Sequence, residues 1–248
     1  MNLGIIIQAR TGSTRLQNKV LLPFYSDYSV LDIVIERLKK LGHPVVVATT
    51  MSKEDDLIVD SAIKLGVDVF RGDEQNVLKR FVDASDKYGF TDAVRICADN
   101  PLMNVDGVKE LIQRYKSGDF DYYSYKLNNG TPVIKSHLGL FGEMVSVNAL
   151  RRALKQIKNT VFLEHVTNYL YENPGEFKVG LSPLPNCFNK TESIRFTLDT
   201  PEDFALLKEI YEELGEDKSQ NWEVLIKFVN ERKELLHRMG GEIRKNRK

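Results

Sequence analysis

The sequence predicts an α/β fold with a mostly parallel sheet and helices on both of its faces. Short apolar runs rich in branched residues, of which residues 3–7 are the first, are typical of fully buried strands. Segments with apolar residues at helical spacing follow them, and turn residues such as Gly42 and Gly66 end those segments. Because strand and helix alternate through the first part of the chain, the pattern indicates parallel βαβ units and a Rossmann-like architecture.

The expected elements can be placed in order along the chain. Ser29 is the predicted N-cap of the first helix, and Pro201 takes the first position of a later one. The predicted strands are residues 3–7, 45–48, 67–70, 93–98, 120–125, 177–181 and 192–198. The predicted helices are residues 30–38, 55–65, 76–88, 105–115, 148–157, 161–171, 201–214 and 221–236.

The regular order breaks at the turn cluster of residues 128–132. Residues 139–147 are irregular or strand-like, and two helices follow them. We therefore predict a single domain, residues 1–248, that carries an insertion at about residues 127–186. Residues 192–198 are expected to return to the sheet as a strand.

The composition argues against several classes of protein. The 35 Lys and Arg residues balance 35 Asp and Glu residues, so the chain has no overall attraction to nucleic acid or to an anionic membrane. Cys97 and Cys187 form neither a disulfide framework nor a paired metal-ligand spacing. No apolar run is long enough to cross a bilayer, and the N-terminus carries no signal segment. We expect a cytoplasmic protein with no nucleic-acid or membrane partner, and a solvated tail at residues 244–248.

The loop after the first strand carries the strongest chemical signal. Three cations, Arg10, Arg15 and Lys19, stand among hydroxyl side chains and free backbone donors, and Gly12 permits a tight path. Successive N–H groups form an anion-binding concavity, Arg adds bidentate contacts to phosphate oxygens, and Lys adds a point charge. A triphosphate fits this combination at the carboxyl end of a strand, whereas a solvated basic loop is the alternative interpretation. The loop matches neither a Walker A nor a G-x-G-x-x-G motif, which argues against a P-loop ATPase or a dinucleotide dehydrogenase.

Two aspartates end later apolar runs in the same way. Asp99 follows residues 93–98, Asp199 follows residues 192–198, and a Pro follows shortly after each Asp. If both strands run parallel to the first, both carboxylates emerge at the sheet edge where the cationic loop begins. Mg²⁺ takes one or two protein carboxylates together with phosphate oxygens. The pair is therefore a candidate metal site, although each Asp alone also fits a turn-capping or helix N-cap position.

The motif Gln8-Ala-Arg-x-Gly-Ser-Thr-Arg-Leu-x-x-Lys-Val-Leu21 resembles the opening of the SpsF-type cytidylyltransferases. These belong to the wider acylneuraminate and CMP-Kdo synthetase family of sugar nucleotidyltransferases. Gln17 stands where the family usually has Pro, which alters the stiffness of the loop and leaves the cations in place. The two aspartate segments are similar to the family patterns Arg-Ile-x-x-Asp-x-Pro-Leu and Arg-x-Thr-x-Asp-Thr-Pro-Glu-Asp. The resemblance implies a fold of the nucleotide-diphospho-sugar transferase type, with Mg²⁺ held by Asp99 and Asp199.

The nucleobase is expected over the loops that follow the second and third strands. Thr49 is placed to contact base or ribose, and Arg71 and Asp73 lie in a segment that resembles the cytosine-reading segment of the family. A surface Arg at a turn is the alternative interpretation of Arg71. The predicted nucleotide-binding residues are Gln8, Ala9, Arg10, Gly12, Ser13, Arg15, Lys19, Thr49, Arg71 and Asp73.

The acceptor end resembles the family less closely. The sequence Glu-His165-Val-Thr matches a family signature in the insertion, and packing of an apolar helix face or a dimer seam is the alternative interpretation. Glu143 is kept in a stretch where Leu138 and Phe141 replace two usual acids, which predicts an altered acceptor pocket. The predicted acceptor-binding residues are Glu143, His165 and Arg195. The resemblance also implies a homodimer formed through the insertion.

These observations and the resemblance predict a cytidylyltransferase. A CMP group would pass from CTP to a small-molecule acceptor, a sugar or sugar-acid-like compound, and pyrophosphate would leave, in the synthesis of surface polysaccharide or glycan precursors. Mg²⁺ is the expected cofactor, and Arg10, Lys19 and Asp99 are the predicted catalytic residues. One alternative is a glycosyltransferase that uses a nucleotide-sugar, which commonly carries Asp-x-Asp where this chain has Asp99-Asn-Pro. Another is a nucleotide-binding homologue without catalysis.

Overall fold

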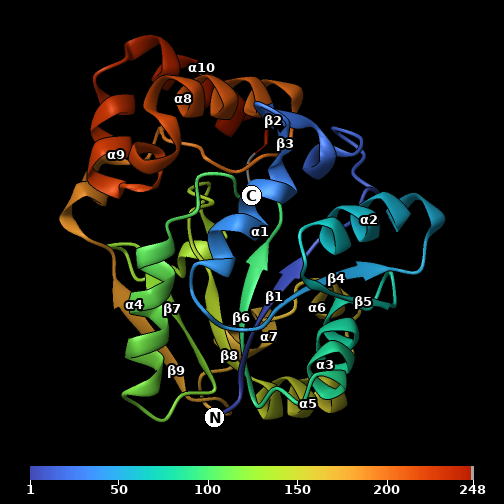
Figure 1. The fold of residues 1–248 in the computed structure, drawn as a ribbon. Helices are drawn as coiled ribbons and strands as arrows, with labels where there is room; N and C mark the ends of the chain where they lie inside the picture. Colours follow the sequence, from blue (N-terminus) through green and yellow to red (C-terminus); the bar gives the residue numbers. More distant parts are fainter. Residues whose placement is uncertain (247–248) are drawn as a thin grey trace.

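The computed structural model describes residues 1–246 and confirms the predicted α/β fold with a mostly parallel sheet. Seven strands form the central sheet in the order β5-β4-β1-β6-β8-β7-β9 (Figure 1). They are β1 (Leu3–Gln8), β4 (Val45–Thr50), β5 (Asp68–Gly72), β6 (Asp92–Cys97), β7 (Tyr122–Lys126), β8 (Glu143–Ser146) and β9 (Val179–Pro183). All neighbours pair in parallel except β8, which is antiparallel to both β6 and β7. The short strands β2 (Pro23–Tyr25) and β3 (Tyr28–Ser29) form a separate hairpin.

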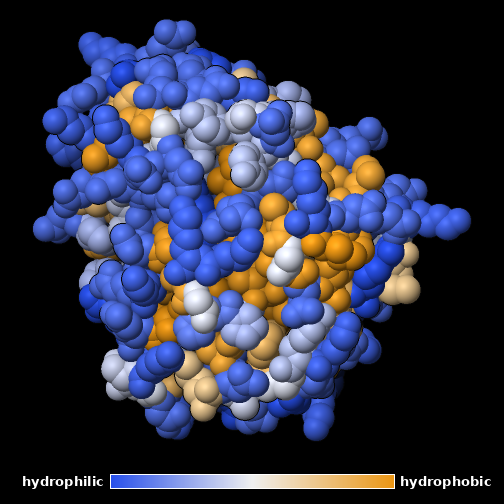
Figure 2. All heavy atoms as spheres, viewed as in Figure 1, coloured by the Kyte–Doolittle hydropathy of each residue, from blue (hydrophilic) through white to orange (hydrophobic). Residues whose placement is uncertain are grey.

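Helices cover both faces of this sheet (Figure 1). They are α1 (Val30–Lys39), α2 (Asp56–Lys64), α3 (Val77–Lys87), α4 (Val105–Lys116), α5 (Val147–Gln156), α6 (Val161–Glu164), α7 (Asn168–Glu172), α8 (Pro201–Gln220), α9 (Trp222–Asn230) and α10 (Lys233–Lys245). Apolar residues of α1, α2, α4, α8, α9 and α10 join one core, and those of α3, α5 and α7 join the other. In the same view, Figure 2 shows hydrophilic residues around the rim and hydrophobic residues in the middle of the face. Within the described part of the chain, no helix has the length and apolar character needed to span a bilayer.

Strand β1 lies at the centre of the sheet and contributes to both cores. Ile5, Ile6 and Ile7 are all 0% exposed. Ile5 and Ile7 belong to one core and Ile6 to the other, as the two-residue period of a strand requires. The predicted N-cap of α1 is also confirmed, because Ser29 and Asp32 form a capping box. Local sequence signals thus set the framework from which the cationic loop emerges.

The strand predicted at residues 192–198 is wrong, because this segment joins no strand ladder among the described residues. Instead, the backbone N–H groups of Phe196 and Thr197 both donate to the carbonyl of His137, at 2.8 and 3.2 Å. The antiparallel strand β8 lies beside β6 in the sheet. Ile194, Phe196 and Leu198 are nevertheless buried. The alternation of apolar residues therefore reflects burial of every second side chain, although the segment does not pair with the sheet.

Three predicted helices differ from the observed ones. The helix expected at residues 161–171 is divided into α6 and α7 at His165, whose φ and ψ are −107° and 80°. The helix expected at residues 221–236 is divided into α9 and α10 at Arg232, with φ −115° and ψ 94°. Helix α8 continues to Gln220 beyond a non-helical Gly215 (φ 74°), which directly follows the predicted end of that helix.

Two further expectations concern the second half of the chain. The segment at residues 127–186, expected as an insertion, contributes β8 and β9 to the central sheet and is therefore built into it. Its expected role in dimer formation stays a prediction. In the solvated tail expected at residues 244–248, Arg244 and Lys245 are exposed to solvent as predicted, and they complete α10. Residues 247–248 lie outside the described residues.

Candidate active site

The carboxyl ends of β1 and β6 lie side by side, because Gln8 pairs with Cys97 in the parallel ladder. The loops that follow these two strands therefore begin at the same edge of the sheet, where ligands of open α/β sheets bind. The first loop carries the predicted phosphate ligands, and the second begins with Ala98 and Asp99.

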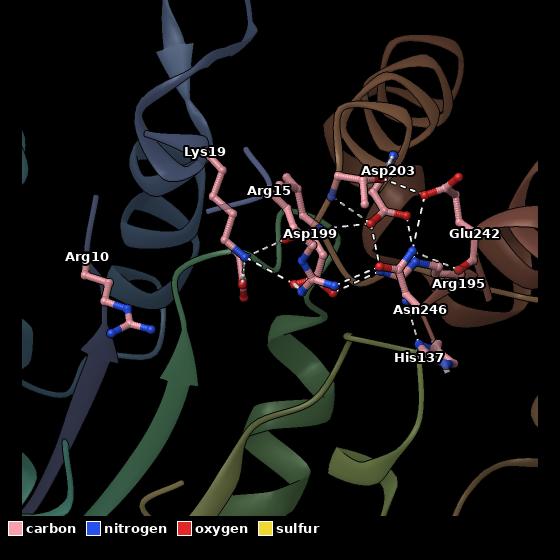
Figure 3. Close-up of polar contacts among 12 residues, drawn as sticks. Arg10, Arg15, Lys19, His137, Arg195, Asp199, Asp203, Glu242 and Asn246 are labelled. Carbon is pink, nitrogen blue, oxygen red and sulfur yellow. Dashed lines mark hydrogen bonds and ion pairs between the residues drawn. The ribbon is translucent and has the colours of Figure 1, made fainter. Parts of the chain in front are cut away.

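The two predicted metal-binding aspartates meet at the ammonium group of Lys19. Lys19 opens a short 3-10 turn at residues 19–21, and its Nζ donates to Asp99 Oδ2 at 2.5 Å. The same Nζ donates to the carbonyl of Leu198 at 2.6 Å and lies 3.5 Å from Asp199 Oδ1 (Figure 3). Two carboxylates that are far apart in the sequence are thus neighbours in space, as predicted.

These carboxylates keep Lys19 charged. Burial lowers the pKa of Lys19, but the charges of Asp99 and Asp199 outweigh burial and leave the pKa raised. The side chain of Lys19 is 13% exposed, whereas those of Asp99 and Asp199 are 28% and 18% exposed. The acids therefore still face solvent, and a ligand that approaches from outside can reach them.

The three cations of the loop do not all face the same place. Arg15 lies beside the acids, with its Nη2 2.9 Å from Asp199 Oδ1, and its Nη1 donates to Asn246 Oδ1 at 2.8 Å. Arg10 lies apart from this cluster, and Figure 3 shows its side chain at the left, away from Lys19, Arg15 and Asp199. Its Nη2 is 3.4 Å from Glu164 Oε1, and both side chains are exposed, so this ion pair is weak.

A buried arginine holds Asp199 in place. Arg195 is 2% exposed, and its Nε and Nη2 donate to the two oxygens of Asp203 at 2.6 and 2.8 Å. Nη2 also donates to Asp199 Oδ2 at 2.9 Å, and Nη1 lies 2.6 Å from His137 Nδ1 (Figure 3). Asp203 accepts the backbone N–H groups of Asp199 and Thr200 as well, at 2.9 and 3.0 Å. The acceptor contact predicted for Arg195 stays a prediction, and the contacts observed here position Asp199.

A second buried network lies beneath Gln8. Arg95 donates from Nη2 to Gln8 Oε1 at 3.1 Å and from Nη1 to Glu143 Oε2. Glu143 is 1% exposed, and its Oε1 accepts hydrogen bonds from Tyr122 at 2.7 Å and Thr167 at 2.9 Å. Because Arg95 occupies the amide oxygen of Gln8, the amide nitrogen of Gln8 is left to donate. Direct contact of Glu143 with an acceptor stays a prediction, and its observed partners lie within the protein.

The other predicted acceptor residues lie in different environments. His165 is exposed and follows Glu164, the partner of Arg10, at the end of α6. Leu138 and Phe141, which replace two usual acids, are buried at 2% and 7% exposure in the apolar core. These two side chains therefore belong to the packed core beneath this region and add no exposed apolar side chain at its surface.

The predicted base-binding residues lie beyond the ends of β4 and β5. Thr49 is fully buried, whereas Arg71 is partly exposed and donates from Nε to the carbonyl of Thr50 at 2.8 Å. Asp73 Oδ1 accepts the backbone N–H groups of residues 75 and 76, so it shapes the turn before α3. The buried Arg80 supports the same turn by donating to the carbonyl of Asp73 at 2.7 Å. In the cationic loop itself, Ala9 is buried, Gly12 is exposed and Ser13 is partly exposed.

Asp55 joins the cationic loop to the end of β4. It is 1% exposed, and Oδ1 accepts from the backbone N–H and the hydroxyl of Thr11 at 2.8 and 2.7 Å. Oδ2 accepts from the hydroxyls of Thr49 and Thr50 at 2.8 and 2.6 Å and from the N–H of Thr50 at 3.1 Å. Burial alone raises the pKa of Asp55, but the hydrogen bonds from Thr11, Thr50 and Thr49 outweigh it and lower the pKa from 3.8 to about 2.

Asp55→Asn is expected to lower the free energy of unfolding at neutral pH by about 2 kcal/mol, because an amide cannot accept all five hydrogen bonds. The depressed pKa means that the ionised form contributes stability above the ordinary pKa of 3.8, and that this contribution is lost as the pH falls toward about 2. Urea unfolding of both proteins at about pH 7, 5 and 3 should show a difference that narrows at the lowest pH. Asp60→Asn, at an exposed position of helix α2, which directly follows Asp55, is the matched control. A difference that does not change with pH would contradict this role of Asp55.

Asp99 and Asp199 were also predicted to hold a metal ion. Among residues 1–246 there is no group of three or more His, Cys, Asp or Glu side chains that could enclose a metal. The two carboxylates nevertheless share one cation already, the ammonium of Lys19, and both remain partly exposed. Two carboxylate ligands suit Mg²⁺, which fills its other coordination positions with phosphate oxygens and water. The residues present therefore fit the predicted ion.

Several supporting residues were not assigned from the sequence. Asp203 had a local signal, since Thr200 and Asp203 have the spacing of a capping box before α8. Arg95 lies in β6 two residues before Cys97, but its partner Glu143 comes from another strand. The contacts of Asp55 with Thr11 and of Asn246 with Arg15 had no local signal, because they join residues that are far apart in the sequence.

The chain is similar to known proteins over most of its length. A family model described as cytidylyltransferase matches residues 4–232. The spore coat polysaccharide biosynthesis protein SpsF of Bacillus subtilis is 33% identical over 232 residues, which are 91% of this chain and 92% of the relative. A cytidylyltransferase structure from Leptospira borgpetersenii has a TM-score of 0.84 and 28% identity and covers 95% of this chain and 97% of its own. A CMP:2-keto-3-deoxy-manno-octonic acid synthetase solved with CTP shares the fold, with a TM-score of 0.64 and 16% identity over 86% of this chain and 99% of its own. These similarities confirm the resemblance that the opening loop and the two aspartate segments predicted.

Proposed function

This chain belongs to the cytidylyltransferase family, and from that membership we propose that it transfers a CMP group from CTP to a sugar or sugar-acid-like acceptor and releases pyrophosphate. The observation that supports this best is the meeting of Asp99 and Asp199 at Lys19, with Arg15 beside them. The relative SpsF is named for spore coat polysaccharide, and we assign the product of this chain to surface polysaccharide or glycan precursors.

In the proposed reaction, a hydroxyl or anionic oxygen of the acceptor attacks the α-phosphorus of CTP in line. The new oxygen–phosphorus bond forms as the bond to pyrophosphate breaks, so no covalent intermediate on the protein is needed. Lys19 and Arg15 supply positive charge for the departing pyrophosphate, and the partial burial of Lys19 strengthens its effect. Arg10 is proposed to meet the same phosphates from the side of Glu164, because its weak ion pair can be exchanged for a phosphate contact.

Asp99 and Asp199 are the residues that would hold a divalent cation, and Mg²⁺ is proposed. Such an ion would polarise the α-phosphate and would lower the pKa of an acceptor hydroxyl. The chain's own contribution is to orient the acids. Arg195 and the backbone contacts of Asp203 fix Asp199, while Lys19 fixes Asp99. Because these side chains are already held in place, little conformational entropy is lost when the substrates bind and react.

The remaining binding roles are proposed by position. Gln8, Ala9, Gly12, Ser13 and the three loop cations are assigned to the nucleotide, together with Thr49, Arg71 and Asp73 at the ends of the neighbouring strands. The acceptor is assigned to the side of His165, because Glu164 joins that segment to Arg10. We further propose a cytoplasmic homodimer formed through the segment at residues 127–186, as the family resemblance implies.

The proposal is tested by measuring pyrophosphate release from CTP, ATP, GTP and UTP in the presence of Mg²⁺. The acceptor panel contains neutral sugars, sugar phosphates and 2-keto sugar acids, and parallel reactions contain EDTA. We expect release from CTP with one acceptor class and loss of the signal in EDTA. Tight CTP binding without turnover on any acceptor would instead support the non-catalytic alternative. Cleavage of a nucleotide-sugar under the same conditions would support a glycosyltransferase.

A further inference from the structure

Helix α10 lies against the active site although it falls outside the matched family segment. The family model ends at Arg232, and α10 begins at Lys233. Figure 1 shows α10 beside α8, and Leu235 and Met239 of α10 are buried in the same core as α8 and α9. The packing fixes the helix so that its last turn reaches the cluster around Asp199 (Figure 3).

Two contacts join this last turn to the site. Glu242 is 4% exposed, and its Oε2 accepts a hydrogen bond from the hydroxyl of Thr200, the residue after Asp199, at 2.9 Å. Asn246 Oδ1 accepts from Arg15 Nη1 at 2.8 Å, and its Nδ2 donates to the carbonyl of Glu242 at 3.0 Å. Figure 3 shows Arg15, Asn246 and Glu242 next to one another. The turn therefore connects the residue after one predicted metal ligand with a predicted phosphate ligand.

We propose that Asn246 is a positioning residue for Arg15 and that Glu242 fixes the last turn of α10 to the Asp199–Thr200 segment. This inference rests on the proposed function, in which Arg15 binds the triphosphate of CTP. The side chain of Arg15 is 51% exposed, so on its own it would sample many rotamers. Its contacts with Asp199 on one amino group and Asn246 on the other restrict the guanidinium to the edge of the site. Such restriction lowers the entropic cost of binding a phosphate.

The test is a double-mutant cycle on CTP affinity with the full-length protein. Asn246→Ala is expected to weaken CTP binding by about 5- to 10-fold, as the loss of one ordinary, partly exposed hydrogen bond would. Arg15→Ala should weaken binding at least as much. In the Arg15→Ala background, Asn246→Ala should have no further effect, because the side chain that Asn246 positions is then absent. Isothermal titration calorimetry with CTP and Mg²⁺ measures all four proteins, and circular dichroism melting verifies that each is folded.

Arg244→Ala is the matched control, since Arg244 is exposed in the same turn of α10, and it should bind CTP as the wild type does. The inference is overturned if Asn246→Ala binds CTP normally, or if its effect simply adds to that of Arg15→Ala. Failure of the proposed function looks different. In that case the wild-type protein itself binds no CTP and releases no pyrophosphate, and the proposed role of Asn246 in CTP binding is then also wrong.

Discussion

Asp99→Asn is expected to lower kcat for pyrophosphate release by about 10²- to 10³-fold, with a smaller change in KM for CTP. Asp99 accepts the 2.5 Å hydrogen bond from Lys19 and is one of the two acids proposed to hold Mg²⁺. An amide of the same shape removes one negative charge from this pair and leaves Lys19 with a weaker partner. Steady-state kinetics with CTP and the preferred acceptor measure the effect, and a titration with Mg²⁺ shows whether more metal is needed.

The matched control for this change is Asp106→Asn. Asp106 is exposed in the first turn of α4. Its replacement removes the same negative charge from the chain, but not from the pair of acids proposed to hold Mg²⁺. We expect kcat to change by less than about 2-fold, because an isolated surface charge contributes little. Full activity in Asp99→Asn would remove Asp99 from the catalytic and metal-binding assignments.

Glu143→Leu is expected to lower the free energy of unfolding by about 3–5 kcal/mol, because it leaves Arg95 buried without its carboxylate. The side chains of Arg95 and Glu143 are 8% and 2% exposed, so water cannot replace the lost partner. Arg95→Met combined with Glu143→Leu should recover at least about 2 kcal/mol, since no buried charge is then unpaired. The hydroxyls of Tyr122 and Thr167 and the amide oxygen of Gln8 still lose their partners. Urea unfolding measures both changes.

The double variant also tests whether the network of Arg95 and Glu143 supports activity as well as stability. If Glu143 acts by positioning Gln8 through Arg95, the double variant stays impaired in kcat/KM even where its stability recovers. Glu110→Gln provides the control, because the exposed pair of Glu110 and Arg114 should contribute no more than about 0.5 kcal/mol. Recovery of normal kcat/KM in the double variant would contradict the positioning role, and an unchanged stability of Glu143→Leu would contradict the buried ion pair.

The framework of the site could be predicted because its signals are local. The buried run at residues 3–7, the cap at Ser29 and the turn glycines place β1 and its loop without reference to distant residues. The two aspartates could be located because each follows an apolar run and precedes a Pro. Their meeting was predicted from a returning parallel strand, and this reason is wrong for Asp199. Asp199 reaches the site from a segment held by His137, Asp203 and Lys19 outside the sheet.

The supporting contacts could not be predicted because they join residues that are far apart in the sequence. Arg195 has the same sequence pattern whether it faces an acceptor or a buried Asp203, and only the packing of α8 distinguishes the two. Arg10 and Arg15 stand in one loop, yet one faces Glu164 and the other Asp199. Asn246 lies in a basic segment typical of a solvated tail, and its contact with Arg15 depends on the break at Arg232 that starts α10.

By itself, the sequence of this protein determined the central strands, the composition of the cationic loop and the two acids beside it. Each of these depends on side-chain burial or backbone preference over a few neighbouring residues. Only the tertiary structure decided which strand lies beside β6, which cations face the acids and which buried arginines hold Asp199 and Gln8 in place. These arrangements form because a buried charge is costly unless a group of opposite charge lies beside it. The partner can come from a distant part of the chain, so only the folded structure shows which residues pair.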